Sequence, residues 1–492
     1  MSAPPVSRTR SFSVVLAVEL WERFGYYGMQ GVLLLFLVHA LHFPEINATL
    51  LMGAFAALTY AIPAAGGWLG DRVTGSRRAV IAGSLTLSFG YALLGLATFV
   101  PAMLYAGMGL VAVGNGLFKP NAANLVRRIY DGDDARIDAA FTLYYMAVNV
   151  GSMVSLLLTP WLAAHVGWFA PFATCSAGLL SGLASVLLGR RALEHVGSEP
   201  DFRPFPVTSV LFTCGGVLVS TALVGIILSS QSLAKAIVWL AGLSVLIGWT
   251  AIYLRSDRRA RAGLRLVGLL VMETILFFIF YEQTSTSLIL FAEHNVRQDF
   301  TIAGHTLFSL TAGQLQALNP FWIILASPIL ARVYARMAAA GRDFSIASKF
   351  VAGFGLVTLA FAIWWLSAAW SPEPMISPWV MFWAYGAQST GELLISALGL
   401  AFIARYVDRR IGAFMSGAYF LSVGISMYLG SFVASMAALP AASSTADPAA
   451  TLPVYADLFR MLTLVGAGGT ILFALLLPLA RKWDREFQQT GG

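Results

Sequence analysis

One short segment, residues 18–30 with the sequence VELWERFGYYGMQ, places ionisable side chains inside an otherwise hydrophobic run. At about 100° per residue in a helix, six of its polar positions fall within an arc of about 140°. They are Glu19, Glu22, Arg23, Tyr26, Tyr27 and Gln30. Two carboxylates that compete for one arginine favour a group that takes up and releases a proton. The alternative is an ion-pair cluster that only holds helices together.

Further ionisable residues are spread over the rest of the chain, again inside hydrophobic runs. Lys119 occurs in GNGLFKPNAAN, Glu282 in FYEQTSTSL and Glu392 in STGELLISALG. A charge at the centre of a membrane helix costs roughly 2.5–3.5 kcal/mol on insertion scales, so such residues are functional candidates by default. Glu392 has no basic neighbour in its own segment, and Lys119 is one of two buried bases that could pair with it.

The two halves of the chain therefore differ in charge. The first contributes acids together with both buried bases, Arg23 and Lys119, and the second contributes lone acids. A cavity between the halves would be cationic on one wall and anionic on the other, which suits a zwitterion. Transporter sites lie near the bilayer midplane among interrupted helices, and Pro120 and Pro320 predict two such interruptions. The alternative for Lys119 is that its side chain extends to the inner membrane surface.

Uncharged polar residues give a weaker signal. Tyr145, Asn149 and Ser152 share one helix face in FTLYYMAVNVGS, and Asn319 stands directly before Pro320 in LNPFW. Hydrogen bonds between helices explain such residues as well as substrate binding does.

Composition places all these residues in a membrane protein. The chain has 492 residues, of which 58% are hydrophobic and 11% charged, whereas soluble domains carry about 25% charged residues. A helix of about 20 apolar residues spans a bilayer, and fourteen such segments are predicted. Their expected limits are 14–39, 48–70, 79–99, 101–126, 139–164, 168–189, 207–229, 232–254, 266–292, 310–335, 346–369, 377–404, 411–437 and 455–480.

The basic residues predict how these segments are oriented. With the N-terminus in the cytoplasm, 26 of the 31 Lys and Arg residues fall in cytoplasmic segments and three on the opposite side. Because positive charge is retained on the cytoplasmic side, we expect both termini there, in a multi-pass membrane protein. This distribution also accounts for the net charge of +7 without nucleic acid, since topology and contact with anionic lipid explain it.

The predicted spans group as six, two and six. Residues 1–190 are expected to form an N-terminal six-helix bundle, and residues 266–492 a C-terminal one. Residues 191–265 supply a charged linker and a two-helix hairpin. The hairpin carries no charge except Lys235 at its outer turn, so no chemistry is expected of it.

The chain resembles the proton-coupled oligopeptide transporters, a branch of the major facilitator superfamily, over its whole length. The motif Glu19-x-x-Glu22-Arg23-Phe24 matches the signature of the family's first span, and GGWLGDR at 66–72 matches the loop after the second. The other motifs follow in the family's order: KPN (119–121), FTLYYMAVNVGS (141–152), YEQ (281–283), LNP (318–320) and GELLIS (391–396). The resemblance implies an all-α polytopic membrane protein with the major facilitator superfamily fold, in which two six-helix bundles and an inserted two-helix hairpin give 14 transmembrane helices.

The resemblance also implies a proton-coupled symporter of the bacterial inner membrane that imports di- and tripeptides by alternating access. The peptide carboxylate should meet Arg23 and Lys119, and its amino terminus should meet Glu392. The implied proton-coupling residues are Glu19, Glu22, Arg23 and Glu282. The implied substrate-binding residues are Arg23, Tyr26, Tyr27, Gln30, Tyr60, Lys119, Tyr145, Asn149, Phe278, Asn319, Glu392, Ser396 and Tyr419. The proton is the coupling ion, and neither a cofactor nor a metal is expected.

Three departures from the family pattern matter. Many members carry arginine at Gln30, where it can pair with the acid at Glu282, so this chain must hold Glu282 differently. Tryptophan is frequent in the family at Phe278 and Tyr419, so the pocket is expected to differ in shape. The histidine of animal members falls at Gly53, and nitrate-carrying plant relatives use that histidine, which argues against nitrate.

Other functions compete with this one. An exporter or carrier of drugs or other zwitterionic metabolites could use the same fold, and a receptor that does not transport could use the same site. An intramembrane enzyme is not expected, because no nucleophile–base pair or metal-ligand set lies within a predicted span. The protein is expected to be a monomer whose partners are di- and tripeptides, protons and the lipid bilayer.

Overall fold

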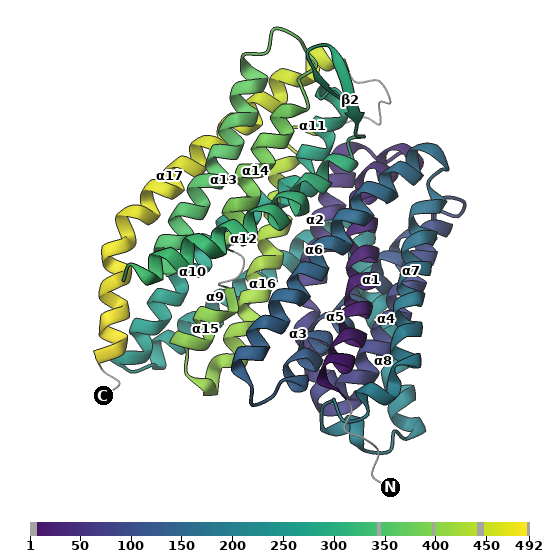
Figure 1. Ribbon diagram of the computed structural model, residues 1–492, viewed down its shortest axis with the longest axis vertical. Helices are drawn as coiled ribbons and strands as arrows, with labels where there is room; N and C mark the ends of the chain where they lie inside the picture. The colour runs from purple at the N-terminus through teal and green to yellow at the C-terminus, as the bar shows by residue number, and fades with distance from the viewer. Residues whose placement is uncertain (1–6, 342–345, 396–398, 440–446, 490–492) are drawn as a thin grey trace. The chain divides into compact units, whose positions relative to one another are not determined.

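The computed structural model describes residues 7–341, 346–395, 399–439 and 447–489. These residues are mostly helical (Figure 1) and fall into two compact units. Unit 1 comprises Met1–His42 and Ala54–Ala234, and unit 2 comprises Phe43–Gly53 and Lys235–Gly492. One boundary lies inside helix α2 (Glu45–Ala61), so the first half of that helix belongs to unit 2.

The first part of the chain supplies the helices of unit 1 and the shared helix α2. They are α1 (Arg8–Leu35), η1 (Phe36–Ala40), α2 (Glu45–Ala61), α3 (Pro63–Leu69), η2 (Gly70–Thr74), α4 (Ser76–Leu96), α5 (Met103–Ile129), α6 (Asp134–His165), α7 (Phe169–Leu188), η3 (Arg190–Leu193), η4 (Glu199–Phe202) and α8 (Val207–Ser229).

The second part supplies the remaining helices and one two-stranded sheet. They are α9 (Gln231–Arg255), α10 (Arg258–Tyr281), η5 (Glu282–Ser285), α11 (Ser287–Asn295), β1 (Asp299–Ile302), β2 (His305–Ser309), η6 (Gln314–Ala317), α12 (Leu318–Ala339), α13 (Ile346–Ala369), α14 (Trp379–Ile395), α15 (Gly399–Tyr406), α16 (Arg409–Ala434) and α17 (Pro448–Gln489). Figure 1 shows α17 running along α13, the pair that packs most extensively within unit 2.

Eleven helical segments of the described residues are long and apolar enough to cross a membrane. In hydrocarbon every backbone polar group needs a partner inside the protein, which helices provide. Neither α1 nor α5 is among the eleven. Helix α1 carries Glu19, Glu22 and Arg23, and helix α5 carries Lys119. These charged residues make the two helices less apolar, and they are also the functional candidates.

Neither of the two prolines that predicted an interrupted helix breaks its helix in the structure. Helix α5 runs through Pro120, which cannot donate to the carbonyl of Gly116. Gly66 of α3 packs directly against that carbonyl, and a Cβ there would overlap it. Asn121 donates from Nδ2 to the Gly66 oxygen over 3.0 Å, which ties the two helices together. In α12 the proline, Pro320, lies in the first turn, where a missing N–H costs little.

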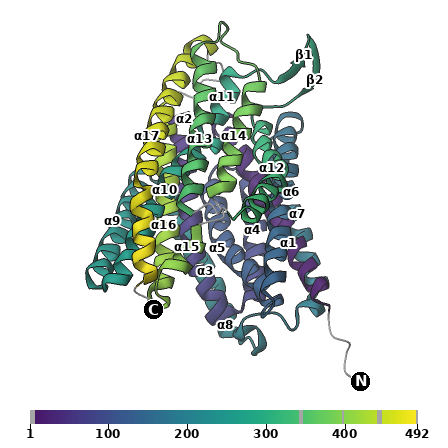
Figure 2. The same ribbon diagram turned by 60° about the vertical axis from the view of Figure 1, so that its left-hand side comes forward.

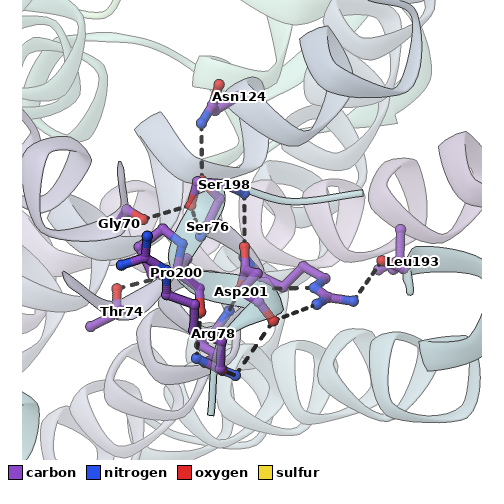
Figure 3. Close-up of polar contacts among 12 residues, drawn as sticks. Gly70, Thr74, Ser76, Arg78, Asn124, Leu193, Ser198, Pro200 and Asp201 are labelled. Carbon is purple, nitrogen blue, oxygen red and sulfur yellow. Dashed lines mark hydrogen bonds and ion pairs between the residues drawn. The ribbon is translucent and has the colours of Figure 1, made fainter. Parts of the chain in front are cut away.

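The linker after α7 is pinned to the turn between η2 and α4 (Figure 3). Asp201 accepts hydrogen bonds from the backbone N–H groups of Ser198 and Arg77, at 3.0 and 3.1 Å. Ser198 donates to the Gly70 oxygen over 2.8 Å and accepts from the Ser76 N–H over 2.9 Å. This polar cluster joins the GGWLGDR motif to the linker and holds the two segments at one end of unit 1.

A short β-hairpin was absent from the helical prediction. Strands β1 and β2 pair antiparallel, and Figure 2 shows them projecting at the end of unit 2 where α11 lies. Trp379 donates from its indole N–H to the Thr301 oxygen over 3.0 Å, and its ring packs edge-on against Phe300. The hairpin is thus attached to the start of α14.

Candidate substrate and proton sites

Arg23, Glu19 and Glu22 form one buried charge cluster on α1. They expose 3%, 2% and 0% of their surface. Arg23 Nε lies 3.3 Å from Glu19 Oε1 and forms a second ion pair with Glu22. Within the described part of the chain, Glu19 Oε2 and the Arg23 Nη2 have no hydrogen-bond partner. The cluster therefore retains a buried acceptor that can take a proton and a buried donor that can take an anion.

Neighbouring helices contribute three residues to this cluster. Asn115 of α5 places Nδ2 3.4 Å from Glu22 Oε1, and Tyr144 of α6 hydrogen-bonds to Glu19. Lys119 lies one turn beyond Asn115, is exposed, and interacts electrostatically with all three members of the cluster. Two acids and two bases thus share one region of unit 1.

Tyrosines surround the two bases. The Arg23 guanidinium carbon lies 5.4 Å from the centre of the Tyr26 ring, and Lys119 Nζ lies 5.2 Å from that of Tyr60. The Tyr26 and Tyr27 rings meet edge-on with centres 5.7 Å apart. Aromatic faces stabilise cations at these distances, so the tyrosines hold the bases where a substrate anion could meet them.

On α6 the tyrosine that contacts the charge cluster is Tyr144, and not the predicted Tyr145. Asn149 is buried but donates to the Tyr145 carbonyl of its own helix over 2.8 Å, and 39% of Tyr145 is exposed. Tyr144 instead reaches Glu19. Gly151, two turns along the same face, marks where α1 passes, because a Cβ there would lie 2.7 Å from the Leu20 oxygen. In the sequence, Gly151 was the one sign that the helix face carrying Tyr144 packs against α1.

Unit 2 holds Glu392 in a polar setting on α14. Asn319 donates from Nδ2 to Glu392 Oε2 over 2.8 Å, and the same nitrogen lies 3.1 Å from the Ser389 hydroxyl. Glu392 is 9% exposed. The structure therefore brings together the two predicted residues, Asn319 and Glu392. The sequence analysis did not name Ser389. It could have been found because residues three apart on a helix lie on the same face, and Ser389 stands three residues before Glu392.

Glu282, at the junction of α10 and η5, forms a second acidic site in unit 2. The Ser431 hydroxyl of α16 donates to Glu282 Oε1 over 3.0 Å. Next to it, Gln283 donates from Nε2 to the Gly430 oxygen over 2.9 Å. Among the described residues of unit 2, neither Glu282 nor Glu392 has a basic side chain within ion-pair distance. Neutral donors hold both carboxylates there.

The other predicted residues occupy varied environments. Gln30 on α1 and Phe278 on α10 are half-buried. Tyr419 is buried, hydrogen-bonds to Thr274 and packs edge-on against Phe402. Ser396 lies outside the described residues.

A further buried pair was not anticipated. His294 of α11 places Nε2 3.0 Å from Glu45 Oε1 at the start of α2, and its Nδ1 lies 3.1 Å from the Tyr455 hydroxyl. The second oxygen of Glu45 accepts from the Leu439 N–H over 2.9 Å. Both residues stand at predicted span ends, where sequence offers no sign of a partner. Within the described residues, no group of three or more His, Cys, Asp or Glu side chains could hold a metal ion.

The profile of the POT family matches residues 77–451. The chain belongs to the POT family. Curated members are similar over nearly their whole length. Dipeptide and tripeptide permease B of Salmonella typhimurium is 37% identical, over 99% of this chain and 98% of the relative. Dipeptide and tripeptide permease A of Proteus mirabilis is 38% identical, over 96% of this chain and 95% of the relative.

Solved structures of the POT family agree. Tetrameric PepTSo2 is 42% identical with a TM-score of 0.89, and the match covers 97% of this chain and 100% of that one. A bacterial homologue of the human drug peptide transporters PepT1 and PepT2 is 43% identical with a TM-score of 0.88 and the same coverage. These findings confirm the predicted family and the major facilitator superfamily fold in a multi-pass membrane protein. They identify the chain as a member of a transporter family and not as an enzyme.

Proposed function

We propose that the protein is a proton-coupled symporter that imports di- and tripeptides by alternating access. The observation that carries the proposal is the charge division between the units. Unit 1 holds a buried Arg23 with two carboxylates, and unit 2 holds Glu392 among neutral donors. Relatives named dipeptide and tripeptide permeases support it, as does a 44% identical structure described under proton-dependent oligopeptide transporters. The exporter alternative is not favoured by these names.

The charge balance of unit 1 accounts for the coupling. With Glu19 and Glu22 ionised, their two negative charges balance Arg23 and Lys119. One proton on either carboxylate leaves the region with an excess positive charge. A peptide carboxylate can then bind the arginine at Nη2, which has no hydrogen-bond partner among the described residues, through a charge-assisted hydrogen bond. Proton and peptide thereby favour each other's binding.

The opposite end of the peptide requires an acid. Glu392 can accept an ammonium group while Asn319 continues to orient the carboxylate from Nδ2. An ammonium that leaves water needs such a counter-charge with further hydrogen bonds. The remaining proposed contacts are to uncharged parts of the peptide and come from Tyr26, Tyr27, Gln30, Tyr60, Tyr145, Asn149, Phe278, Ser396 and Tyr419.

Glu282 is proposed as an additional proton-coupling residue. Its carboxylate is buried and is held by Ser431, which can donate to the ionised form. One charge that crosses 100 mV releases about 2.3 kcal/mol. At about 1.4 kcal/mol per factor of ten, a single coupled proton supports roughly 40-fold accumulation of a neutral zwitterion.

Uptake into proteoliposomes tests the proposal. Purified protein is reconstituted, an acid-outside pH gradient is imposed, and labelled dialanine inside the vesicles is counted. We expect concentrative uptake that collapses when a protonophore is added, and competition by unlabelled tripeptides but not by free amino acids. Absence of uptake under every imposed gradient, from protein that still binds dialanine, would contradict symport and leave a receptor.

Orientation and location are part of the proposal. The distribution of basic residues supports both termini in the cytoplasm, and the bacterial origin of the similar permeases supports a place in the bacterial inner membrane. Alkaline phosphatase is active only outside the cytoplasm, so a fusion after residue 492 should be inactive and a fusion at residue 304, within the turn of the β-hairpin, should be active. The reverse pattern would overturn the orientation.

The monomer is the proposed transporting unit. Each chain contains one complete set of the proposed proton-coupling and peptide-binding groups. The tetrameric relative makes the state worth measuring. Multi-angle light scattering in detergent gives the oligomer mass, and vesicles that hold on average less than one chain should still take up dialanine. Uptake that appears only above one chain per vesicle would contradict the proposal.

A further inference from the structure

An apolar groove lies on unit 2 between α9, α10 and α16, outside the residues assigned to transport. It encloses about 360 Å³. The α9 wall includes Leu246 and Trp249, and the α10 wall includes Gly268 and Met272. Ser422 is a polar side chain of the α16 wall, and its hydroxyl already donates to Ala418 in its own helix. The groove therefore offers hydrocarbon contact.

Helix α9 touches the rest of unit 2 sparsely, which leaves the groove open. The apolar stretch of α9 has no buried residue in its most hydrophobic window, and Figure 2 shows the helix at an edge of unit 2. Contact is made at small residues: a side chain at Gly268 would meet Trp249, and one at Gly242 would meet Ile425. Met272 and Leu246 stay 66% and 63% exposed. An occupant of the groove would shield these side chains.

Basic side chains stand at one end of the groove. Tyr253 lies one turn beyond Trp249 on α9, and Arg265 lies one turn before Gly268 on α10. Arg265 Nε donates to the Tyr253 hydroxyl over 2.8 Å. Arg261 Nε donates to the Tyr253 carbonyl over 3.1 Å. These bonds hold both guanidinium groups on the α9 side of α10.

The other three arginines of residues 255–265 do not contact Tyr253 in the same way: Arg255 and Arg258 are exposed, and Arg259 lies against α17. Residues 255–265 contain five arginines and one acid, Asp257, whose carboxylate caps α10 by accepting from the Ala260 N–H over 2.8 Å. Arg259 lies over the ring of Phe487 on α17, 4.9 Å from its centre. Arg261 and Arg265 therefore differ from Arg259 in position while sharing its charge.

We propose that unit 2 binds one anionic phospholipid, with an acyl chain in the α9–α10–α16 groove and its phosphate at Arg261 and Arg265. The groove residues on α10 run from Gly268 to Ile275, a rise of about 10 Å, which fits within one leaflet of a hydrocarbon core about 30 Å thick. The arginines lie beyond the end of that stretch, where a headgroup phosphate lies. Guanidinium groups bind phosphate through paired hydrogen bonds. A neutral lipid or a second copy of the chain would use the groove without using this charge.

Native mass spectrometry of the full chain tests the site. Delipidated protein is titrated with phosphatidylglycerol or with phosphatidylcholine of the same acyl chains. The wild type should bind one phosphatidylglycerol more tightly than phosphatidylcholine. Two surface arginines are worth about 30-fold in affinity for an anionic lipid, so the double variant Arg261→Gln/Arg265→Gln should lose about that preference. Arg259→Gln, the matched control, should keep it.

Filling the groove tests the acyl-chain half of the site. Gly268→Leu should weaken binding of both lipids, and the exposed position Met272→Trp provides a second way to fill the groove if the first variant fails to fold. Equal affinity of the wild type for the two lipids would overturn the proposal. So would an effect of Arg259→Gln as large as that of the double variant, since that result indicates diffuse charge attraction. A lipid-free dimer that the groove-filling variants abolish would assign the groove to a second copy instead.

Discussion

Ser431 donates a hydrogen bond to Glu282 over 3.0 Å, and this contact shows how the acid is held without an arginine at position 30. Gly430 lets α16 approach closely, since a Cβ there would lie 2.7 Å from the Glu282 Cβ. Gln283 then closes the junction by donating to the Gly430 oxygen. A hydroxyl and a backbone carbonyl of one helix thus secure two adjacent side chains of another.

Ser431→Ala should lower the stability of the folded protein and slow transport. The substitution leaves one oxygen of a buried carboxylate without its donor, and a hydrogen bond to a charged group contributes about 1.5–3 kcal/mol. We expect a lower thermal unfolding midpoint in detergent and reduced proton-driven uptake of dialanine. Ser435→Ala, in the turn that directly follows α16, removes a hydroxyl that donates to the Phe432 carbonyl of that helix, and it should change neither. Equal behaviour of the two variants would mean that Ser431 does not support Glu282.

Glu22→Gln should abolish concentrative uptake while peptide counterflow persists. The side chain keeps its size and can still accept from Asn115, but it no longer takes up a proton. Uptake driven by an acid-outside gradient equivalent to about 100 mV should fall to the level of protein-free vesicles. This is a loss of at least about tenfold, because one proton supports roughly 40-fold accumulation under that driving force. Glu199→Gln, on an exposed residue paired with Arg203, serves as the control. A Glu22→Gln protein that still concentrates dialanine would remove Glu22 from the coupling group.

Glu392→Gln should lower the affinity for peptides with a free amino terminus. Glutamine retains an acceptor for Asn319, so the local structure should persist while the charge that faces an ammonium is lost. Loss of a charge-assisted hydrogen bond of about 1.5–3 kcal/mol raises KM by roughly 10- to 150-fold. The wild type should strongly prefer dialanine to N-acetyl-dialanine, and the variant should prefer it much less. An unchanged preference would place the amino terminus away from Glu392.

Gly53→Ala should disturb the Glu282 site from the opposite side. A Cβ at Gly53 would overlap the Ser431 side chain, which must then move from Glu282 or push α2 away. Overpacking of this kind costs about 1–3 kcal/mol, so the unfolding midpoint should fall. Gly215→Ala is the matched control, because nothing lies within 4 Å of a Cβ there and alanine favours a helix. A Gly53→Ala protein as stable as the control would contradict this packing.

Much of the helical architecture could be predicted because the membrane imposes it. Runs of apolar residues and the positions of arginines follow from the cost of exposing peptide groups and charges to hydrocarbon. The Glu19–Glu22–Arg23 cluster was predictable for the same reason, since its members share one face of one helix. The β1–β2 hairpin was missed because it lies outside these constraints, between two spans.

Side-chain contacts between residues far apart in the chain could not be predicted from the sequence. Ser431 and Glu282 are separated by 149 residues, and serine is too common in membrane helices to mark a site. His294 and Glu45 stand at span ends, where charged residues are ordinary. Tyr144 and Tyr145 are adjacent and chemically identical, so only the packing of α1 against Gly151 decides which one meets Glu19.

The division of α2 between the two units has a consequence for biosynthesis. Glu45 leaves the ribosome early, but its partner Leu439 follows 394 residues later, which takes roughly 20–80 s at about 5–20 residues per second. During that interval the first half of α2 has crossed into the membrane without Leu439 and without Ser431, which lies against Gly53 in the finished protein. Translation must therefore approach its end before the start of this helix can settle. A ribosome that stalls within α16 would leave Glu45 and the Gly53 side of α2 uncovered for quality control to recognise.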